Sequence, residues 1–421
     1  MADQYVIRPI SDDEYAAFRR VHDHSFNSGP APAARWPRLR RQFEAERSLA
    51  AFDPGLPAGA GLVGTTGVYS FQMAVPGAVF PVAGVTAVSV LPTHRRRGIL
   101  RSLMSRQIAD IAARGEEPIA ALWASETPLY GRYGYGRASS HASFRFGRGE
   151  GALIALAPVD PRLTLRLAEP LAAAADLAKV YDTVLSGQPG FFTRDDDWWE
   201  RVLDDPAEER RGASPLRCVL AADGDGVRGY SLYRSTARWE EGTVLPDGSI
   251  DVWELIAADP AASAALWRNL LSRDLITSVT ADLRPADDPL LYQLHDSRRA
   301  RVRVVDNLWA RIIDLPGALA RRAYSSPVDV VLEVTDELLP ANAGRWRLRA
   351  GGPDGGADCT RTDQPADIAL NVRELGAAYL GGTRLAALAA AGLLDELRPG
   401  AVGRLSIAMS WDPAPWCPRI F

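Results

Sequence analysis

A long uncharged segment limits the folds that this chain can adopt. Residues 54–94 contain no Asp, Glu, Lys or Arg. A membrane-spanning helix needs about 20 predominantly apolar residues in helical form, but Pro76, Gly77, Pro81 and Gly84 interrupt this segment repeatedly. Uncharged, β-rich runs between such breaks are typical of strands in a buried sheet. We therefore predict a meander of buried strands, over residues 62–70, 72–79 and 82–90.

Helical patterns flank this strand region. Ser11 and Glu14 have the spacing of a capping box, which predicts the start of a helix. After the uncharged segment, the apolar residues of 99–111 form one helical stripe, and Gly115 ends the predicted helix. The next predicted elements are a strand over 119–123, a glycine and aromatic turn over 130–136, and a strand over 143–146. This alternation predicts an α/β fold class.

Composition excludes several classes of function. The chain has 421 residues, 47% of them hydrophobic, and a formal net charge of -4, whereas a general nucleic-acid binder is strongly basic. The cysteines, Cys218, Cys359 and Cys417, are too scattered for a disulfide framework, and the histidines form no HExxH motif, so we expect no metal. The N-terminus lacks the pattern of a signal peptide, which favours a cytoplasmic protein without a membrane partner.

The middle of the chain repeats the pattern of its beginning. A predicted strand and helix over 163–184 resemble the opening strand and helix, and strand 252–256 ends shortly before a proline, as strand 82–90 does. The second copy has alanines and a serine at 261–265, where the first copy has arginines and a glycine. These similarities indicate a duplicated domain whose second copy has lost a phosphate site. Chance similarity between two α/β segments is the alternative.

The character of the sequence changes from about Val304. Strand, turn and strand are predicted over 346–361, a further strand over 367–370, and helices over 375–380 and 385–397. This pattern predicts a third, α+β domain. The predicted domains are residues 1–150, 151–303 and 304–421.

Residues 88–100 carry the pattern that is most informative about chemistry. A buried strand ends, a loop of arginines and a glycine follows, and a helix begins. Unpaired N–H groups and the positive end of the dipole make a helix N-terminus suited to a pyrophosphate. Gly98 lets the backbone approach closely, and arginines add charge-assisted hydrogen bonds. The edge of the strand is then able to pair with an extended amide arm such as pantetheine.

This segment resembles the coenzyme A loop of the GCN5-related N-acetyltransferase (GNAT) superfamily, which is written R/Q-x-x-G-x-G/A. Arg95, Gly98 and Leu100 occupy the three defined positions, and Leu100 departs from the small residue of the pattern. The alternative for this motif alone is a basic surface loop before a helix.

The wider sequence resembles the Eis (enhanced intracellular survival) family of multi-site aminoglycoside N-acetyltransferases. The likeness is carried by THRRRGIL at 93–100, ASETPLYGRYGYG at 124–136 and a chain that ends at Phe421. It implies an active GNAT domain over 1–150, a degenerate GNAT domain over 151–303, and over 304–421 a domain like sterol carrier protein 2. It also implies acetyl-CoA as cosubstrate, a small-molecule amine as partner and a homohexamer.

The resemblance further implies the roles of individual residues. The coenzyme site would comprise Val88, Ser89, Val90, Arg95, Arg96, Arg97, Gly98, Ile99, Leu100, Arg101, Ser125 and Glu126. Tyr130 would be the general acid that protonates the departing thiolate, although Tyr133 and Tyr135 are equivalent by composition. The acceptor pocket would include Phe26, Trp36, Trp123 and Asp296, for which ordinary packing is the alternative.

The last residues point to a role for the chain end. Residues 411–421 are apolar, rich in proline and aromatic, so we expect them to dock into protein, unlike a fraying terminus. A docked α-carboxylate of Phe421, ionised at neutral pH, is able to accept a proton from an ammonium substrate. The resemblance supports this role of a general base. A simple hydrophobic anchor is the alternative.

Other functions stay open at this point. The resemblance implies acidic residues that hold a polycationic aminoglycoside, but Asn27, Ser28 and Ile420 stand where it places such acids. The acceptor is alternatively a lysine, a peptide or another small amine. A lipid carrier or a protein that senses acetyl-CoA without turnover is the alternative from another class.

Overall fold

The computed structural model describes residues 5–32, 35–57 and 61–421, and the chain divides into two compact units. The first unit contains the chain up to Ser139, then Leu308–Asp412, and finally Ile420–Phe421. The second unit contains Ser140–Asn307 and Pro413–Arg419.

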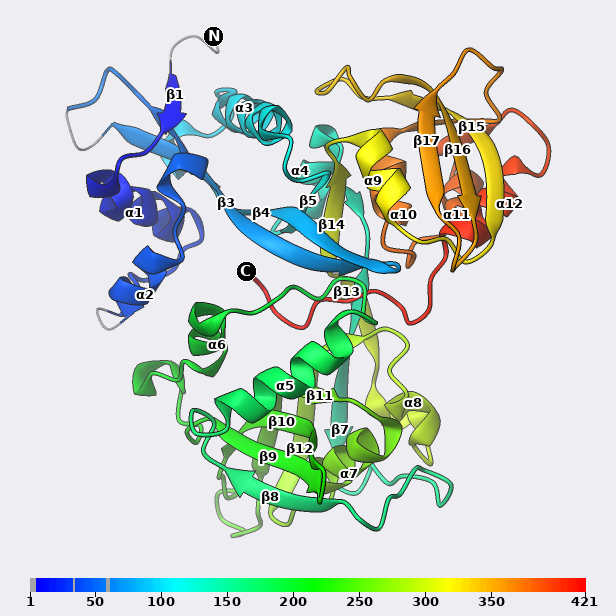
Figure 1. Ribbon diagram of the computed structural model, residues 1–421. Helices are drawn as coiled ribbons and strands as arrows, with labels where there is room; N and C mark the ends of the chain where they lie inside the picture. Colours follow the sequence, from blue (N-terminus) through cyan, green and yellow to red (C-terminus); the bar gives the residue numbers. More distant parts are fainter. Residues whose placement is uncertain (1–4, 33–34, 58–60) are drawn as a thin grey trace. The chain divides into compact units, whose positions relative to one another are not determined.

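A seven-stranded sheet forms the centre of the first unit (Figure 1). Its strands, in spatial order, are β1 (Val6–Pro9), β2 (Leu49–Phe52), β3 (Leu62–Val75), β4 (Ala78–Val90), β5 (Ile119–Trp123), β14 (Leu308–Ile312) and β6 (Gly136–Arg137). The uncharged segment forms β3 and β4, which pair as one long hairpin. β3 is one continuous strand where two were predicted, because the first turn comes only at Gly77, with φ 74°.

The helices that come from the same stretch of the described chain are α1 (Tyr15–Ser25), α2 (Trp36–Arg41), α3 (Ile99–Arg114) and α4 (Thr127–Tyr130). The backbone N–H of Ser11 donates to the Glu14 carboxylate over 3.0 Å, as the capping box predicts. α3 buries Met104 and Ile108 in the core that β4 and β5 line, and Gly115 ends it in the left-handed conformation as predicted.

The first unit also contains a five-stranded sheet. Its strands, in spatial order, are β17 (Ala357–Arg361), β16 (Gly344–Gly351), β15 (Pro327–Thr335), β18 (Ile368–Asn371) and β19 (Leu394–Glu396). The helices from this part of the chain are α9 (Leu315–Arg321), α10 (Val372–Ala378), α11 (Leu385–Ala390) and α12 (Ala401–Met409). The helix predicted over 385–397 is wrong beyond Ala390. Gly392, with φ 72°, follows its end, and residues 394–396 pair with β18.

A second seven-stranded sheet forms the centre of the second unit. Its strands, in spatial order, are β13 (Arg303–Asp306), β7 (Ser140–Gly147), β12 (Ile276–Pro285), β11 (Gly248–Ala257), β10 (Gly226–Thr236), β9 (Arg217–Asp223) and β8 (Thr164–Ala168). The helices of this unit are α5 (Ala174–Leu185), α6 (Asp196–Leu203), α7 (Pro260–Leu271) and α8 (Leu290–Gln293). Trp267 of α7 is fully buried against Phe144 of β7, which places the core on the α7 face of the sheet.

Two strands join a different sheet from the one that their position in the sequence suggests. β7 falls within the expected domain 1–150, yet it pairs with β12 and β13 in the second unit. β14 falls within the expected domain 304–421, yet it pairs with β5 and β6 in the first sheet. Alternating hydrophobicity indicates a strand but not the sheet that the strand enters.

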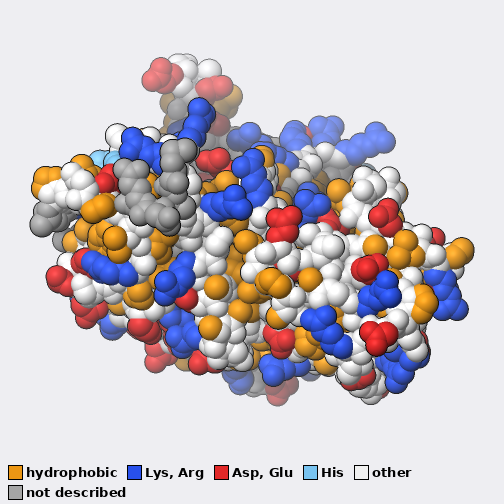
Figure 2. Space-filling view, turned by 90° about the horizontal axis from the view of Figure 1, so that it is seen from above, with side chains coloured by type: hydrophobic (Ala, Val, Ile, Leu, Met, Phe, Trp, Pro, Cys, Tyr) orange, Lys and Arg blue, Asp and Glu red, His pale blue; other side chains and the backbone are white. Residues whose placement is uncertain are grey.

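The surface carries charges of both signs. On the face shown in Figure 2, arginine, acidic and hydrophobic side chains are interspersed over the described residues. None of the helices in the described part of the chain is both long and apolar enough to cross a bilayer.

Candidate active site

The edge of β4 opens where its pairing with β5 ends. The two strands run parallel and pair from Val82 to Val85 of β4, the last pair being Val85 with Leu122. β4 nevertheless continues to Val90. Within the described strands, residues 86–90 therefore present an edge that does not pair with β5. The predicted pantetheine residues Val88, Ser89 and Val90 lie on this segment.

A β-bulge lies at the start of the open edge. Ala87 has φ 51°, and two residues of β4, Ala87 and Val88, lie opposite one residue of β3. Thr65 Oγ1 donates a hydrogen bond to the carbonyl of Ala87 over 2.7 Å. A bulge bends its strand, so it accounts for the end of the pairing with β5. No glycine marks this bulge, so the sequence does not predict it.

α3 begins with backbone donors that no side chain caps. Gly98, with φ 84°, precedes the helix, and the first turn holds no acidic residue. The first helical hydrogen bond runs from the N–H of Ser102 to the carbonyl of Gly98, over 3.1 Å. The N–H groups of residues 99–101 therefore have no partner within the helix. Arg95, Arg96 and Arg97 come directly before Gly98, Arg101 lies in the first turn, and all four are exposed.

The arginine loop is held from one side by a buried histidine. His94 Nε2 lies 3.3 Å from Asp53 Oδ2, and its Nδ1 lies 2.8 Å from Thr93 Oγ1. Arg97 Nη1 donates to the hydroxyl of Tyr5 over 3.3 Å. Ile99 is buried and Leu100 partly buried in the cores beside α3, so these two residues would contact a coenzyme through their backbone.

Tyr130 lies at the end of α4 and is buried. Burial raises the pKa of Tyr130, and a hydrogen bond with the Ser125 side chain partly opposes this shift. The phenol is therefore protonated at neutral pH, as a general acid must be. Ser125 and Glu126 are exposed in the segment before α4. Tyr135 is fully buried and packs edge-on against Tyr130, with ring centroids 6.3 Å apart.

The chain end contacts β4, and Phe421 is partly buried where burial was expected. Thr86 Oγ1 donates to a carboxylate oxygen of Phe421 over 3.3 Å. The ring of Phe421 packs against Phe71 of β3, with centroids 5.1 Å apart at 72°. A Cβ on Gly84 would lie 3.4 Å from the Phe421 ring. The sequence does not predict the role of Thr86, because nothing local relates it to a residue 335 positions away.

The predicted acceptor residues have separate surroundings. Phe26 is exposed and stacks on His22 at 4.6 Å, and Trp36 packs edge-on against Tyr15 at 5.9 Å. Trp123 is the last residue of β5 and is partly buried. Asp296 belongs to the second unit, where its carboxylate accepts the N–H of Arg298 over 3.1 Å and caps a short helix. No group of His, Cys, Asp and Glu that could hold a metal ion occurs among the described residues.

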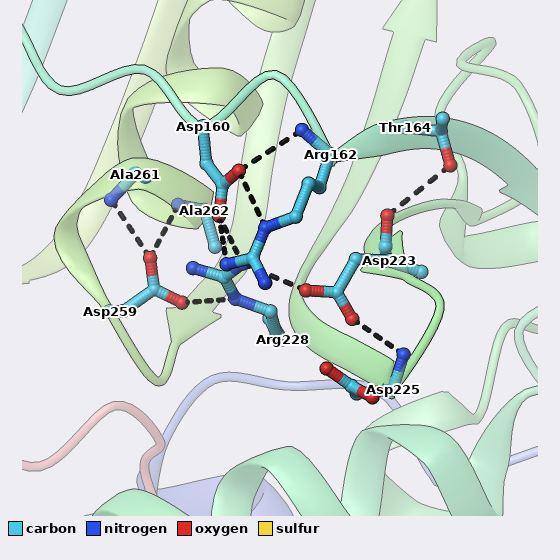
Figure 3. Close-up of polar contacts among 10 residues, drawn as sticks. Asp160, Arg162, Thr164, Asp223, Asp225, Arg228, Asp259, Ala261 and Ala262 are labelled. Atoms are coloured by element: carbon cyan, nitrogen blue, oxygen red, sulfur yellow. Dashed lines mark hydrogen bonds and ion pairs between the residues drawn. The ribbon is translucent and has the colours of Figure 1, made fainter.

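The helix of the second unit that corresponds to α3 is capped by the chain itself (Figure 3). Asp259 Oδ1 accepts the N–H groups of Ala261 and Ala262 at 2.9 and 3.0 Å. Arg228 Nε donates to Asp259 Oδ2 over 2.8 Å. Burial acts to raise the pKa of Asp259, but these hydrogen bonds hold it below the usual range. An internal carboxylate thus occupies the N-terminus of α7, where a phosphate would otherwise bind.

The strand edge of the second unit is also occupied. The pairs between β11 and β12 end at Val252 and Ala281, although β11 continues to Ala257. The buried side chain of Arg284 donates from Nη1 to the carbonyl of Leu255 over 2.6 Å. The carbonyl of Leu255, on the part of β11 that extends beyond its pairing with β12, is therefore bound internally.

Asp259→Ala is expected to destabilise the second unit by about 0.5–2 kcal/mol, because α7 loses its N-cap. Chemical denaturation of the full chain measures this difference, and Asp195→Ala, which removes the N-cap of α6, is the matched control. Calorimetry on the same variant is expected to give no second site for acetyl-CoA, because Arg284 still occupies the strand edge. A stability equal to that of the wild type would contradict the assigned cap.

Comparisons with known domains agree with this architecture. Residues 6–138 and residues 190–312 each match a family described as an acetyltransferase (GNAT) domain. Residues 315–418 match a sterol carrier protein domain. The predicted fold class, tandem GNAT domains followed by a domain like sterol carrier protein 2, is confirmed. The fold and the site define an N-acetyltransferase of the GNAT superfamily, a class of enzymes that use acetyl-CoA.

Full-length relatives narrow the assignment. An uncharacterized N-acetyltransferase of Streptomyces coelicolor is 44% identical over 415 residues, which are 98% of this chain and 99% of the relative. N-acetyltransferase Eis of Mycobacterium bovis is 34% identical over 391 residues, 91% of each chain. The crystal structure of Eis1 from Mycobacterium abscessus superposes with a TM-score of 0.80 at 33% identity, over 99% of this chain and 100% of that chain. This chain belongs to the Eis family of N-acetyltransferases.

Proposed function

We propose that the enzyme transfers the acetyl group of acetyl-CoA to an amine of a small molecule, at a site formed by β4, Tyr130 and Phe421. The observation that carries the proposal is the contact between the Phe421 carboxylate and Thr86. It puts a potential proton acceptor on β4 at the residue where the open edge begins. That edge offers N–H and C=O groups to the pantetheine arm, and the N-terminus of α3 offers donors to the pyrophosphate.

The proposed reaction uses one base and one acid. The Phe421 carboxylate accepts a proton from the acceptor ammonium, directly or through water. The free amine then attacks the thioester carbonyl, a C–N bond forms and the C–S bond breaks. The departing thiolate takes the proton of the Tyr130 hydroxyl. The products are an acetylated amine and coenzyme A.

The relationship to Eis favours aminoglycosides as the acceptors, with acetylation at one or more of their amino groups. Phe26, Trp36 and Trp123 would supply aromatic contacts. By the same relationship, acids that hold a polycation would stand at three positions occupied here by the uncharged residues Asn27, Ser28 and Ile420. Lysine, peptides and other small amines are therefore the alternative acceptors. The family relationship also supports a homohexamer as the proposed assembly.

A thiol-release assay tests this proposal directly. The enzyme is incubated with acetyl-CoA and a panel of aminoglycosides, polyamines, lysine and lysine peptides. We expect release of coenzyme A that depends on an aminoglycoside, with an acetylated product visible by mass spectrometry. Release of coenzyme A with lysine or polyamines but not with aminoglycosides would show that the acceptor belongs to one of those other classes. Binding of acetyl-CoA without release of coenzyme A for any amine would support a protein that senses acetyl-CoA.

Gly98→Val is expected to weaken acetyl-CoA binding by roughly 10- to 100-fold, the effect of losing one charge-assisted hydrogen bond of about 1.5–3 kcal/mol. Apart from Gly98 and its two neighbours in the chain, no described atom lies within 4 Å of a Cβ at this position, so the new side chain would extend into the space proposed for the pyrophosphate. Gly115→Val is the matched control, because Gly115 has a similar φ and equally open surroundings at the other end of α3. Isothermal titration calorimetry should give one site per wild-type chain, and unchanged affinity in Gly98→Val would remove this loop from the site.

A further inference from the structure

A fully buried arginine lies against the turn that carries Tyr130. Arg311 of β14 is 0% exposed, and a Cβ on Gly134 would lie 1.6 Å from its Nη1. The guanidinium thus fills the space beside Gly134, where only a glycine fits. The turn is closed by hydrogen bonds from the N–H of Gly134 to Gly131 and from the N–H of Tyr135 to Tyr130, at 3.2 and 3.3 Å. Arg311 therefore contacts the closed turn of residues 130–135, which begins with Tyr130.

The sterol carrier protein domain fixes the orientation of this arginine. Arg311 Nη2 donates to both carboxylate oxygens of Asp336, at 2.8 and 2.9 Å. Asp336 also accepts the N–H groups of Leu338 and Leu339 and the side-chain amide of Asn342, each at 3.1 Å. The carboxylate is 2% exposed. Because both bonds between Arg311 and Asp336 are buried, the guanidinium has little freedom to turn away.

An open pocket borders part of the turn on the side of Arg311. A cavity of about 240 Å³ is bounded by Gly131 and Gly134 of the turn, by Arg311 and Asp336, and by Val372 of α10. Nε and Nη1 of Arg311 are buried and have no hydrogen-bond partner in the described structure. Residues of α10 also lie close to the turn. Where the turn borders the cavity, its contact with the guanidinium limits its movement toward that space.

We propose that Arg311 is a positioning residue for Tyr130, and that Asp336 acts through it. The sterol carrier protein domain then sets the geometry of the acetyl-transfer site without touching the substrate. This inference rests on the proposed role of Tyr130 as general acid.

Arg311→Met is expected to lower kcat by roughly 10- to 100-fold, because a displacement of about 1 Å at a reacting group costs about that much. KM for acetyl-CoA should not change, since Arg311 contacts neither the open edge of β4 nor the N-terminus of α3 in the described structure. Asp336→Asn should give a smaller loss of the same kind. The matched control is Arg322→Met, another buried arginine of the first unit, which donates to the carbonyls of Tyr379 and Met409. It should lower the melting temperature and leave kcat unchanged.

A double-mutant cycle separates positioning from general destabilisation. If Arg311 acts through Tyr130, Arg311→Met in a Tyr130→Phe background should change kcat by less than about 2-fold, because the acid is already absent. If the loss of kcat in the double variant equals the product of the two single losses, the inference is overturned. A rise in KM with kcat unchanged in Arg311→Met would overturn it as well. If Arg311→Met does not fold, Asp336→Asn and Arg311→Lys take its place in the cycle. Wild-type activity in Tyr130→Phe would instead refute the proposed acid, a result distinct from failure of the positioning role.

Discussion

Replacing Tyr130 by phenylalanine is expected to lower kcat by roughly 10²–10⁴-fold, the usual contribution of a positioned general acid. The substitution removes only the hydroxyl, so the edge-on packing against Tyr135 stays and the fold should be intact. Acetyl-CoA binding should be unchanged in calorimetry, because the phenol acts on the leaving thiolate. Steady-state thiol release measures the loss.

The pH profile adds a second readout for Tyr130. A general acid must be protonated, so activity falls as pH rises through its pKa, which burial raises above the ordinary value for tyrosine. The descending limb of kcat that belongs to Tyr130 should disappear in the phenylalanine variant. Tyr133→Phe is the control and should keep most activity. If Tyr130→Phe turns over at the wild-type rate, the acid must be sought at Tyr133 or Tyr135.

Adding one glycine after Phe421 is expected to lower kcat by a similar factor, roughly 10²–10⁴-fold, because the carboxylate that would accept the proton is displaced. The aromatic contact of Phe421 with Phe71 is retained, so the chain end should stay docked. Circular dichroism and thermal melting check the fold, and thiol release measures turnover.

Phe421→Leu is the matched control for this extension. It removes the ring but keeps the terminal carboxylate within reach of Thr86, so it should retain much more activity than the extended chain. The two variants together distinguish a base from a hydrophobic anchor. Full activity in the extended chain would falsify the assignment of the base, whereas a larger loss in Phe421→Leu would support the anchor.

Much of the candidate coenzyme site could be predicted from the sequence, because local interactions determine it. Gly98 begins α3 and Gly115 ends it through their own backbone conformations, and the strand before the loop is recognisable from its uncharged, β-rich composition. The hydrogen bonds of a helix end depend on a few neighbouring residues. The element order of strand, arginine loop and helix therefore followed from residues 82–115 alone.

Tertiary structure alone decided which distant segments meet. Thr86 and the Phe421 carboxylate are 335 positions apart, and Arg311 reaches Gly134 only because β14 enters the first sheet beside β5 and β6. Likewise, β7 follows strands of the first sheet in the sequence but pairs with β12 of the second seven-stranded sheet. A strand's periodicity specifies which of its faces is buried, but many strands share that pattern, so the partner is chosen by packing of the whole chain. The sequence by itself thus determined the Eis relationship and the order of strand, arginine loop and helix, whereas the tertiary structure decided where the chain end docks and which residues lie beside the turn of Tyr130.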